Sequence, residues 1–181
     1  AHLKLQLQEE EQARILADAS QQKVGAVLIG HGIQNLAQEA IEYGADIVYM
    51  KEALELANYS TDGYATVFCQ AIKKYSPSAI LVGATPNGRD LAPRIAARVE
   101  TGLCADCTEL AYDEETKLIG WTRPAMGGNI LATILCPKHF PQMGTVRPNV
   151  FKKPERQVGR QGEIVALDAQ LSASDIRTKL L

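Results

Sequence analysis

The sequence has 181 residues, of which 46% are hydrophobic, and a formal net charge of -2 at pH 7. Such a chain can build the core of one domain, and its weak acidity gives no reason to expect the non-specific attraction to nucleic acid that a basic protein has. It contains no run near the ~18 consecutive apolar residues of a membrane-spanning helix, and AHLKLQLQEEE does not resemble a secretory signal. We expect one soluble domain, residues 1–181, located in the cytoplasm or the mitochondrial matrix without membrane insertion.

The first part of the sequence alternates strand-like and helical patterns. Leucines alternate with polar residues over positions 3–7, as in a strand, and helical spacing follows up to about Ser20. Two buried strands are then expected at 24–29 and 47–50, with a helix between them that ends at Gly44 because glycine suits the left-handed residue after a helix. Ser60 or Thr61 can cap a further helix that ends before Pro77.

The middle of the sequence predicts a strand, a tight loop and a helix. The apolar run 79–82 fits a strand buried on both faces, and the glycines and prolines after it require a tight turn. Because proline is tolerated mainly in the first turn of a helix, Pro93 indicates an N-cap near Asp90. One face of that helix is apolar, and Arg94 and Arg98 are expected to point away from it.

The last part of the sequence changes to an antiparallel pattern. Residues 108–112 and 117–121 flank a polar turn, and 129–135 is another apolar run. Further strands are expected at 143–146 and 164–167, an exposed connection over 147–162, and a short helix capped by Ser172 or Ser174. The predicted fold class is α/β, with a Rossmann-like layered sheet of mostly parallel strands, helices on both faces, and an antiparallel extension.

Three segments carry a family resemblance. They are GATPNGRDLAPRIAARVETGLCADCTEL, TRPAMGGNILATILCPKHFPQMGTVRP and VFKKPE. In this order, from about Val24 to the end, the sequence resembles the alpha subunit of electron transfer flavoproteins. The resemblance implies the amino-terminal α/β domain of that subunit, with a tail, about 147–181, that leads toward a flavin domain outside this sequence.

The resemblance also implies a function. It predicts packing on an electron transfer flavoprotein beta subunit, in a heterodimer that carries electrons through FAD between dehydrogenases, such as the acyl-CoA dehydrogenase type, and a redox acceptor. This domain would be non-catalytic and would not bind FAD by itself. AMP or a second FAD is a further ligand that the resemblance allows on the beta subunit.

Four residues are candidate cofactor contacts. Arg123 is a permanent cation with a planar donor fork, beside the adjacent glycines Gly127 and Gly128, in a segment that the resemblance directs toward the beta subunit. Arg147 is a second arginine that could contact a cofactor in the same way, and its alternative role is a salt bridge. Asn87 and Arg89 lie in the loop at 83–90, where a helix amino-terminus could hold a phosphate.

Other classes of function remain open from the residues alone. The loop after Val82 could belong to a small nucleotide-binding α/β enzyme, or the domain could be a plain interaction module. No P-loop lysine or serine follows the loop, and no spacing singles out a nucleophile with a base, so we assign no catalytic residue. A structural turn, or one that contacts the beta subunit, is the alternative for the loop.

The cysteine pattern is compared with redox and metal motifs. Cys104 and Cys107 have the C-x-x-C spacing of redox couples and metal pairs. A structural zinc needs two more ligands, which no second C-x-x-C or H-x-x-x-H supplies, and a thioredoxin-like pair opens a helix, whereas this pair follows one. We therefore expect free thiols at all four cysteines and no metal site.

Overall fold

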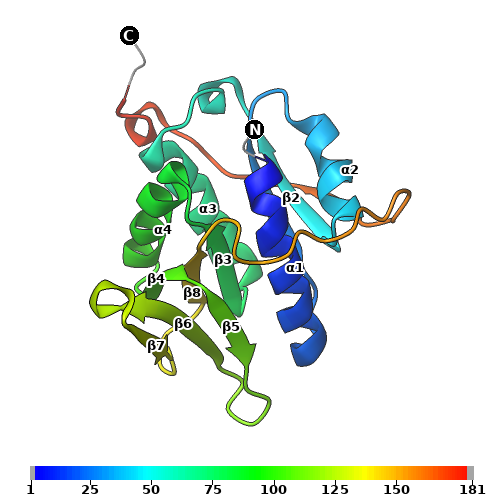
Figure 1. The fold of residues 1–181 in the computed structure, drawn as a ribbon. Coiled ribbons are helices and arrows are strands. Elements are labelled where there is room, and N and C mark those ends of the chain that lie inside the picture. The colour runs from blue at the N-terminus through cyan, green and yellow to red at the C-terminus, as the bar shows by residue number, and fades with distance from the viewer. Residues whose placement is uncertain (1–2, 179–181) are drawn as a thin grey trace.

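The computed structural model describes residues 3–178, with side chains from residue 11 onward, and Figure 1 shows its fold. Strands and helices alternate in the first half of the chain, and consecutive strands follow, as the sequence predicts. None of the described helices has the length and apolar character needed to cross a membrane. The helices are α1 (Leu3–Ser20), α2 (Gln34–Glu42), α3 (Thr61–Tyr75) and α4 (Pro86–Arg98), with 3-10 turns η1 (Leu54–Leu56), η2 (Met126–Gly128) and η3 (Ala173–Asp175).

Within the described residues, the strands form two parallel sheets and one antiparallel sheet. In sheet order, the first parallel sheet is β1 (Gly25–Gly30), β2 (Ile47–Glu52) and β9 (Glu163–Ala166), and the second is β3 (Ala79–Gly83), β8 (Gln142–Val146) and β4 (Leu103–Cys107). The antiparallel sheet is β5 (Glu109–Tyr112), β6 (Ile119–Ala125) and β7 (Ile130–Ile134). The predicted fold class is confirmed: parallel strands flanked by helices, with an antiparallel extension.

Helix α3 packs against both parallel sheets. Ile72 on one side of the helix joins Ile80 of β3 and Ile95 of α4 in one apolar cluster. Val67 on another side joins Tyr49 of β2 in a second cluster. Helix α2 covers the opposite face of the first sheet, because alternate residues of β1 and β2 belong to different clusters. These clusters fix the two sheets relative to α3.

The antiparallel sheet packs closely on the second parallel sheet through Trp121. This residue is 1% exposed and lies in a cluster with Leu16 of α1 and Leu81 of β3. A Cβ atom at Gly144 of β8 would lie 2.2 Å from Trp121 Cε3, so the indole ring rests directly on the backbone of β8. Figure 1 shows β5, β6 and β7 below the second sheet.

The strand predicted at residues 3–7 is wrong. The structure has α1 over Leu3–Ser20 where the alternating leucines predict a strand at 3–7. Alternation over five residues is too short to outweigh the continuous helical spacing that follows. The predicted end of this helix at about Ser20 is confirmed.

The predicted N-cap of α4 near Asp90 is also wrong. The helix begins at Pro86, and Thr85 caps it with a side chain that accepts a hydrogen bond from the Gly88 amide at 3.1 Å. Of the two prolines, Pro86 takes the favoured first position, and Pro93 lies inside the helix. Packing of α4 on α3 and β3 offsets the cost of that interior proline.

Two arginines of α4 bind α3. Arg94 and Arg98 lie off the apolar face, as predicted, and each donates through Nη2 to Oδ1 of Asp62, at 2.6 and 3.1 Å. Asp62 therefore joins the exposed sides of the two helices.

The strand β4 is absent from the sequence-based prediction, whereas the other strands of the second half agree with it. The sequence Leu-Cys-Ala-Asp-Cys has neither a continuous apolar run nor regular alternation. The predicted strands at 143–146 and 164–167 correspond to β8 and β9, and Ser172 caps η3 through a capping box with Asp175.

The close packing at the start of α4 generates a stability prediction. Replacing Gly88 with Ala should lower the free energy of unfolding by about 1–3 kcal/mol, because the new Cβ would lie 1.8 Å from the Gly83 carbonyl oxygen. In an unobstructed helix the same change would stabilise by about 0.5–1 kcal/mol. Urea denaturation measures the difference, and Gly102→Ala is the control, since its nearest new contact is an ordinary 3.4 Å. A more stable Gly88→Ala variant would contradict the packing described.

Candidate functional site: an arginine cluster at the strand ends

The candidate site lies at the carboxyl edge of the second parallel sheet. Strands β3, β8 and β4 run in the same direction, so Gly83, Val146 and Cys107 all lie at this edge. The carboxyl edge of a parallel sheet is the usual location of ligand sites in α/β proteins. Arg147 directly follows β8, and its backbone amide donates to the Cys107 carbonyl at 2.9 Å.

Asp106 occupies an irregular position in β4. The register of β4 against β8 shifts between Cys104 and Cys107, and Asp106 has a φ of 65°, in the left-handed region. Aspartate tolerates this region better than most residues do. Its amide donates to Thr145 Oγ1 at 2.8 Å, which replaces the lost ladder hydrogen bond. The bulge turns the Asp106 carboxylate toward the arginines around it.

Two arginines bind the Asp106 carboxylate. Arg147 donates through Nε to Oδ1 at 3.2 Å and through Nη2 to Oδ2 at 2.6 Å, which is a two-point contact. Arg89 donates through Nη2 to Oδ1 at 3.0 Å and through Nε to the Ala84 carbonyl at 3.0 Å. The hydrogen bond from Arg147, together with the nearby positive charges, lowers the pKa of Asp106.

Arg123 completes the cluster from the antiparallel sheet. It lies on β6 opposite Ala132 of β7, and its charge also lowers the pKa of Asp106. Its Nε atom is buried and has no hydrogen-bond partner among the residues that the structure describes. Two guanidinium groups thus bind this carboxylate and the charge of a third acts on it, which leaves positive charge uncompensated within this set.

Asn87, the fourth candidate, has a described contact on another segment. The Tyr59 hydroxyl lies 2.8 Å from Asp90 Oδ2 and 3.2 Å from the Asn87 backbone carbonyl oxygen, and its one hydrogen is shared between these two acceptors. Burial raises the pKa of Tyr59 to about 12. The Gly88 amide is already bonded to Thr85, and Pro86 has no amide hydrogen, so these two positions offer no free donor to a phosphate. These contacts support a structural role for the backbone at the start of α4.

The arrangement is suited to bind an anion. Side-chain exposure is 58% for Arg89 and 41% for Arg147, so both can meet a ligand while they hold Asp106. Guanidinium groups bind phosphate and carboxylate through paired donors. Sequence reasoning selected the three arginines but missed Asp106 and Thr145. The one feature of the sequence that could have indicated Asp106 is its position as an acidic residue between two cysteines.

An exposed apolar strip lies on the same antiparallel sheet. Strand β7 pairs with β6 and has no second neighbour among the described strands. Large apolar side chains on η2, on β7 and just after it remain exposed, which is unusual for a strand of a folded protein. They are Met126 (79% exposed), Ile130 (54%), Leu131 (64%), Ile134 (42%) and Leu135 (54%).

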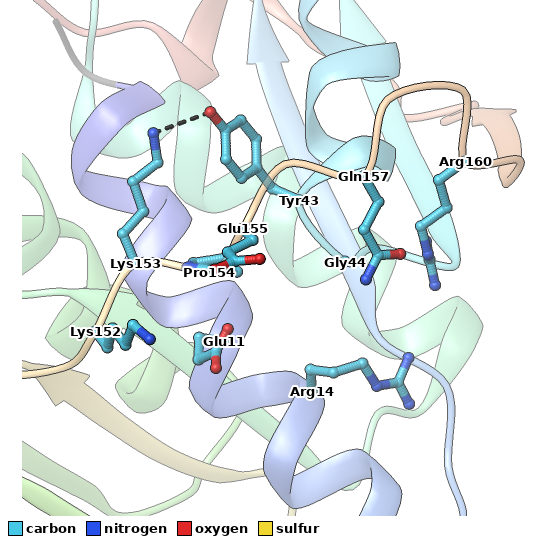
Figure 2. A pocket seen from close by; sticks show the side chains of 10 residues that line it. All are labelled: Glu11, Arg14, Tyr43, Gly44, Lys152, Lys153, Pro154, Glu155, Gln157 and Arg160. Carbon is cyan, nitrogen blue, oxygen red and sulfur yellow. Dashed lines mark hydrogen bonds between the residues drawn. The ribbon is translucent and has the colours of Figure 1, made fainter.

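A separate cavity of about 360 Å³ lies away from the cluster, between α1, the end of α2 and the segment 152–160 (Figure 2). Three of its charged side chains bind other groups of the protein. Arg14 and Arg160 both bind Asp46, at 2.7 Å each, and Lys153 donates to the Tyr43 hydroxyl at 2.9 Å. The cavity lies where the segment 152–160 contacts the rest of the protein, and we assign it no ligand.

The segment predicted as an exposed connection, 147–162, contains no helix or strand, in agreement with the sequence. It is nevertheless anchored on α2 and the loop after it. Arg156 binds the buried carboxylate of Glu42 at 2.7 Å, and the Gly159 amide donates to the same carboxylate at 3.1 Å.

All four cysteines are free, as predicted. Over the described part of the chain, no group of three or more His, Cys, Asp or Glu side chains is arranged to hold a metal ion.

The family model and several relatives that match this chain carry the same family name. A family model described as "Electron transfer flavoprotein domain" matches residues 6–172. The electron transfer flavoprotein subunit alpha of Megasphaera elsdenii is 52% identical over 170 residues, covering 94% of this chain and 50% of the relative. That of Thermoanaerobacterium thermosaccharolyticum is 54% identical, covering 94% and 51%. Subunit LctC of the lactate dehydrogenase (NAD(+),ferredoxin) of Acetobacterium woodii is 45% identical over 158 residues, covering 87% and 38%.

The Asp106 contacts predict a pH-dependent contribution to stability. A carboxylate with a lowered pKa stabilises the folded state above its unfolded pKa of about 3.9 and loses that contribution as pH falls through the folded pKa. Asp106→Asn should therefore cost about 1–3 kcal/mol at pH 7 and less below about pH 4. Asparagine keeps the left-handed backbone accessible, so the substitution tests the charge.

Urea denaturation of both proteins at pH 7 and at pH 3 measures this effect. Asp18→Asn is the control, because Asp18 is 68% exposed and its pair with Arg14 should contribute below about 1 kcal/mol. A loss for Asp106→Asn that is equal at both pH values would show that the charge is not its cause.

Proposed function

Because this chain belongs to the electron transfer flavoprotein family, we propose that it is the part of an alpha subunit that packs on the beta subunit of an electron-carrying heterodimer. The chain spans about half the length of the alpha-subunit relatives that it matches. In this proposal residues 1–181 form one domain, and the tail, about 147–181, leads toward a flavin domain that holds the FAD. The domain alone binds no FAD and performs no catalysis.

The exposed apolar strip on η2 and β7 is the observation that carries this proposal. A group of large exposed apolar side chains along an edge strand is typical of a protein-binding surface. Ile134 lies opposite Trp121 and Ile130 opposite Ala125, so these two isoleucines share the face of the sheet that carries the buried Trp121. Leu131, opposite Pro124, lies on the other face. Both faces of this outer strand therefore carry exposed apolar side chains that a bound protein would cover. The family relationship supplies the partner, which is an electron transfer flavoprotein beta subunit.

The arginine cluster supports a role toward a ligand held by that partner. Arg123 lies on β6, adjacent to the strand that carries the strip, so a protein bound to β7 would also approach this arginine. We propose that Arg123, with Arg147 as a second contact, faces AMP or a second FAD on the beta subunit. Positive charge near a flavin favours its reduced, anionic form. Arg89 and Asn87 are outer members of the proposed contact.

A relative's name indicates the class of redox partner that we propose. LctC, a relative, is a subunit of a lactate dehydrogenase that uses NAD(+) and ferredoxin. We propose that the complete heterodimer likewise exchanges electrons with a dehydrogenase, either of this kind or of the acyl-CoA type. The rival role, a small nucleotide-binding enzyme, would need amide donors for a phosphate at the start of α4, and there the Gly88 amide is bonded within the turn and Pro86 has no amide hydrogen.

Docking through the strip predicts a selective loss of association. Replacing Leu131, which is 64% exposed, with Asp should weaken binding to a beta subunit by at least tenfold while the chain keeps its melting temperature. Leu54→Asp is the matched control, because Leu54 is 72% exposed but lies on η1. Titration of a labelled beta subunit measures both. Equal binding by the two variants would contradict docking through β7.

The ligand role of Arg123 makes a separate prediction. In the assembled heterodimer, Arg123→Ala should weaken partner-held AMP or flavin about 10- to 100-fold, equivalent to about 1.5–3 kcal/mol, or lower the flavin reduction potential. Its melting temperature should remain that of the wild type. Arg177→Ala is the control, since Arg177 is 69% exposed and pairs with Asp62. Ligand titration and potentiometry measure the effect, and an earlier melt with unchanged affinity and potential would indicate a structural role.

A further inference from the structure

The bulge in β4 brings Cys104 and Cys107 to the same side of the strand. In a regular strand, residues three apart point to opposite faces. Here Cys104 pairs with Gly144 and Cys107 with Val146, so three steps along β4 match two steps along β8. The additional residue reverses the alternation between the two cysteines.

Both thiols lie in one apolar cluster. Cys104 is 5% exposed and Cys107 is fully buried, and both belong to the cluster of Trp121. Cys104 Sγ donates to the Trp121 carbonyl at 3.8 Å, and Cys107 Sγ contacts the Cys104 carbonyl at 3.5 Å. The thiols also interact with each other, and this contact lowers the pKa of Cys104 and raises that of Cys107.

The other two cysteines provide a comparison. Cys69 is also buried, at 8% exposure, but it belongs to the cluster of α3, α4 and β3. Cys136 is partly exposed and contacts the His139 carbonyl at 3.4 Å. Neither has a described contact with another thiol, so the Cys104–Cys107 pair differs from them in geometry and not only in burial.

We propose that Cys104 and Cys107 form a reversible disulfide, with a low-molecular-weight disulfide such as oxidised glutathione as the oxidant. The Cys104 thiolate attacks one sulfur of the oxidant and releases one glutathione thiolate. Cys107 then loses its proton, attacks Cys104 Sγ in the mixed disulfide and releases the second glutathione. The protein loses two electrons and two protons, which the two glutathione thiols carry away.

The disulfide would enclose Asp106. The loop between the two sulfurs consists of Ala105 and Asp106, and the carboxylate of Asp106 holds Arg89 and Arg147. Closing the loop acts on the backbone that orients this carboxylate, so the redox state of the pair is linked to the arginine cluster. Because both sulfurs are covered, the exchange requires a local opening of β4 and is slower than exchange at Cys136.

The test uses tryptic peptides that separate the cysteines. The sequence places Cys104 and Cys107 together in peptide 99–117, Cys69 in 52–73 and Cys136 in 118–138. The native chain is incubated with oxidised and reduced glutathione. At intervals a sample is unfolded in urea with iodoacetamide, so that the buried thiols are also alkylated, and is then digested with trypsin and analysed by mass spectrometry. We expect peptide 99–117 to become unlabelled and lighter by two hydrogens, and to recover both labels after dithiothreitol, while Cys69 stays alkylated.

Trp121 gives a second measurement, because it is the one tryptophan of the sequence and shares the cluster with both thiols. A disulfide quenches a nearby indole, so fluorescence should fall on oxidation and recover on reduction. Cys104→Ala should abolish both the fluorescence change and the two-hydrogen loss. The proposal is overturned if both cysteines remain alkylated after Cys136 has exchanged fully, if each carries a glutathione instead, or if the variant shows the same quenching.

Discussion

The contact between the Asp106 carboxylate and the guanidinium groups of Arg147 and Arg89 holds together the carboxyl edge of the second sheet. It joins the bulge of β4 to the residue after β8 and to the second turn of α4. Backbone in the left-handed region costs energy for a residue with a Cβ atom, and these charge-assisted hydrogen bonds offset it. The same bulge sets the direction of the carboxylate and the common side of the two cysteines.

Helix α3 has a comparable importance for the arrangement of the sheets. Its two apolar sides contact different parallel sheets, and each sheet is completed by a strand from late in the chain, β8 or β9. Strand β8 lies between β3 and β4, so the edge that carries the cluster cannot form until residues 142–146 have paired. The site therefore depends on contacts between residues far apart in the sequence, which form slowly because long loops must close.

Local patterns in the sequence predicted the strands and helices that local interactions determine. Apolar runs gave β1, β2 and β3, and helical spacing gave α2 and α3. The central position of β8 could not be predicted, because a short apolar run carries no information about its neighbours. Strand β4 was missed because its bulge breaks the alternation, and for the same reason Asp106 was missed. The arginines were found one by one from their chemistry, but their convergence on one carboxylate depends on tertiary pairing.

The close contact of Trp121 with Gly144 has a mechanical consequence. Because the indole rests on the backbone of β8 with no intervening side chain, the antiparallel sheet has little room to slide over the parallel sheet. Trp121 lies opposite Ile134 of β7, and Gly144 is three residues before Arg147. Force applied to β7 would therefore be transmitted through the Trp121–Gly144 contact to β8 and to Arg147, which follows it. This contact should keep the two sheets in one relative position, so that a protein bound on β7, as we propose, would meet the arginines at a fixed distance.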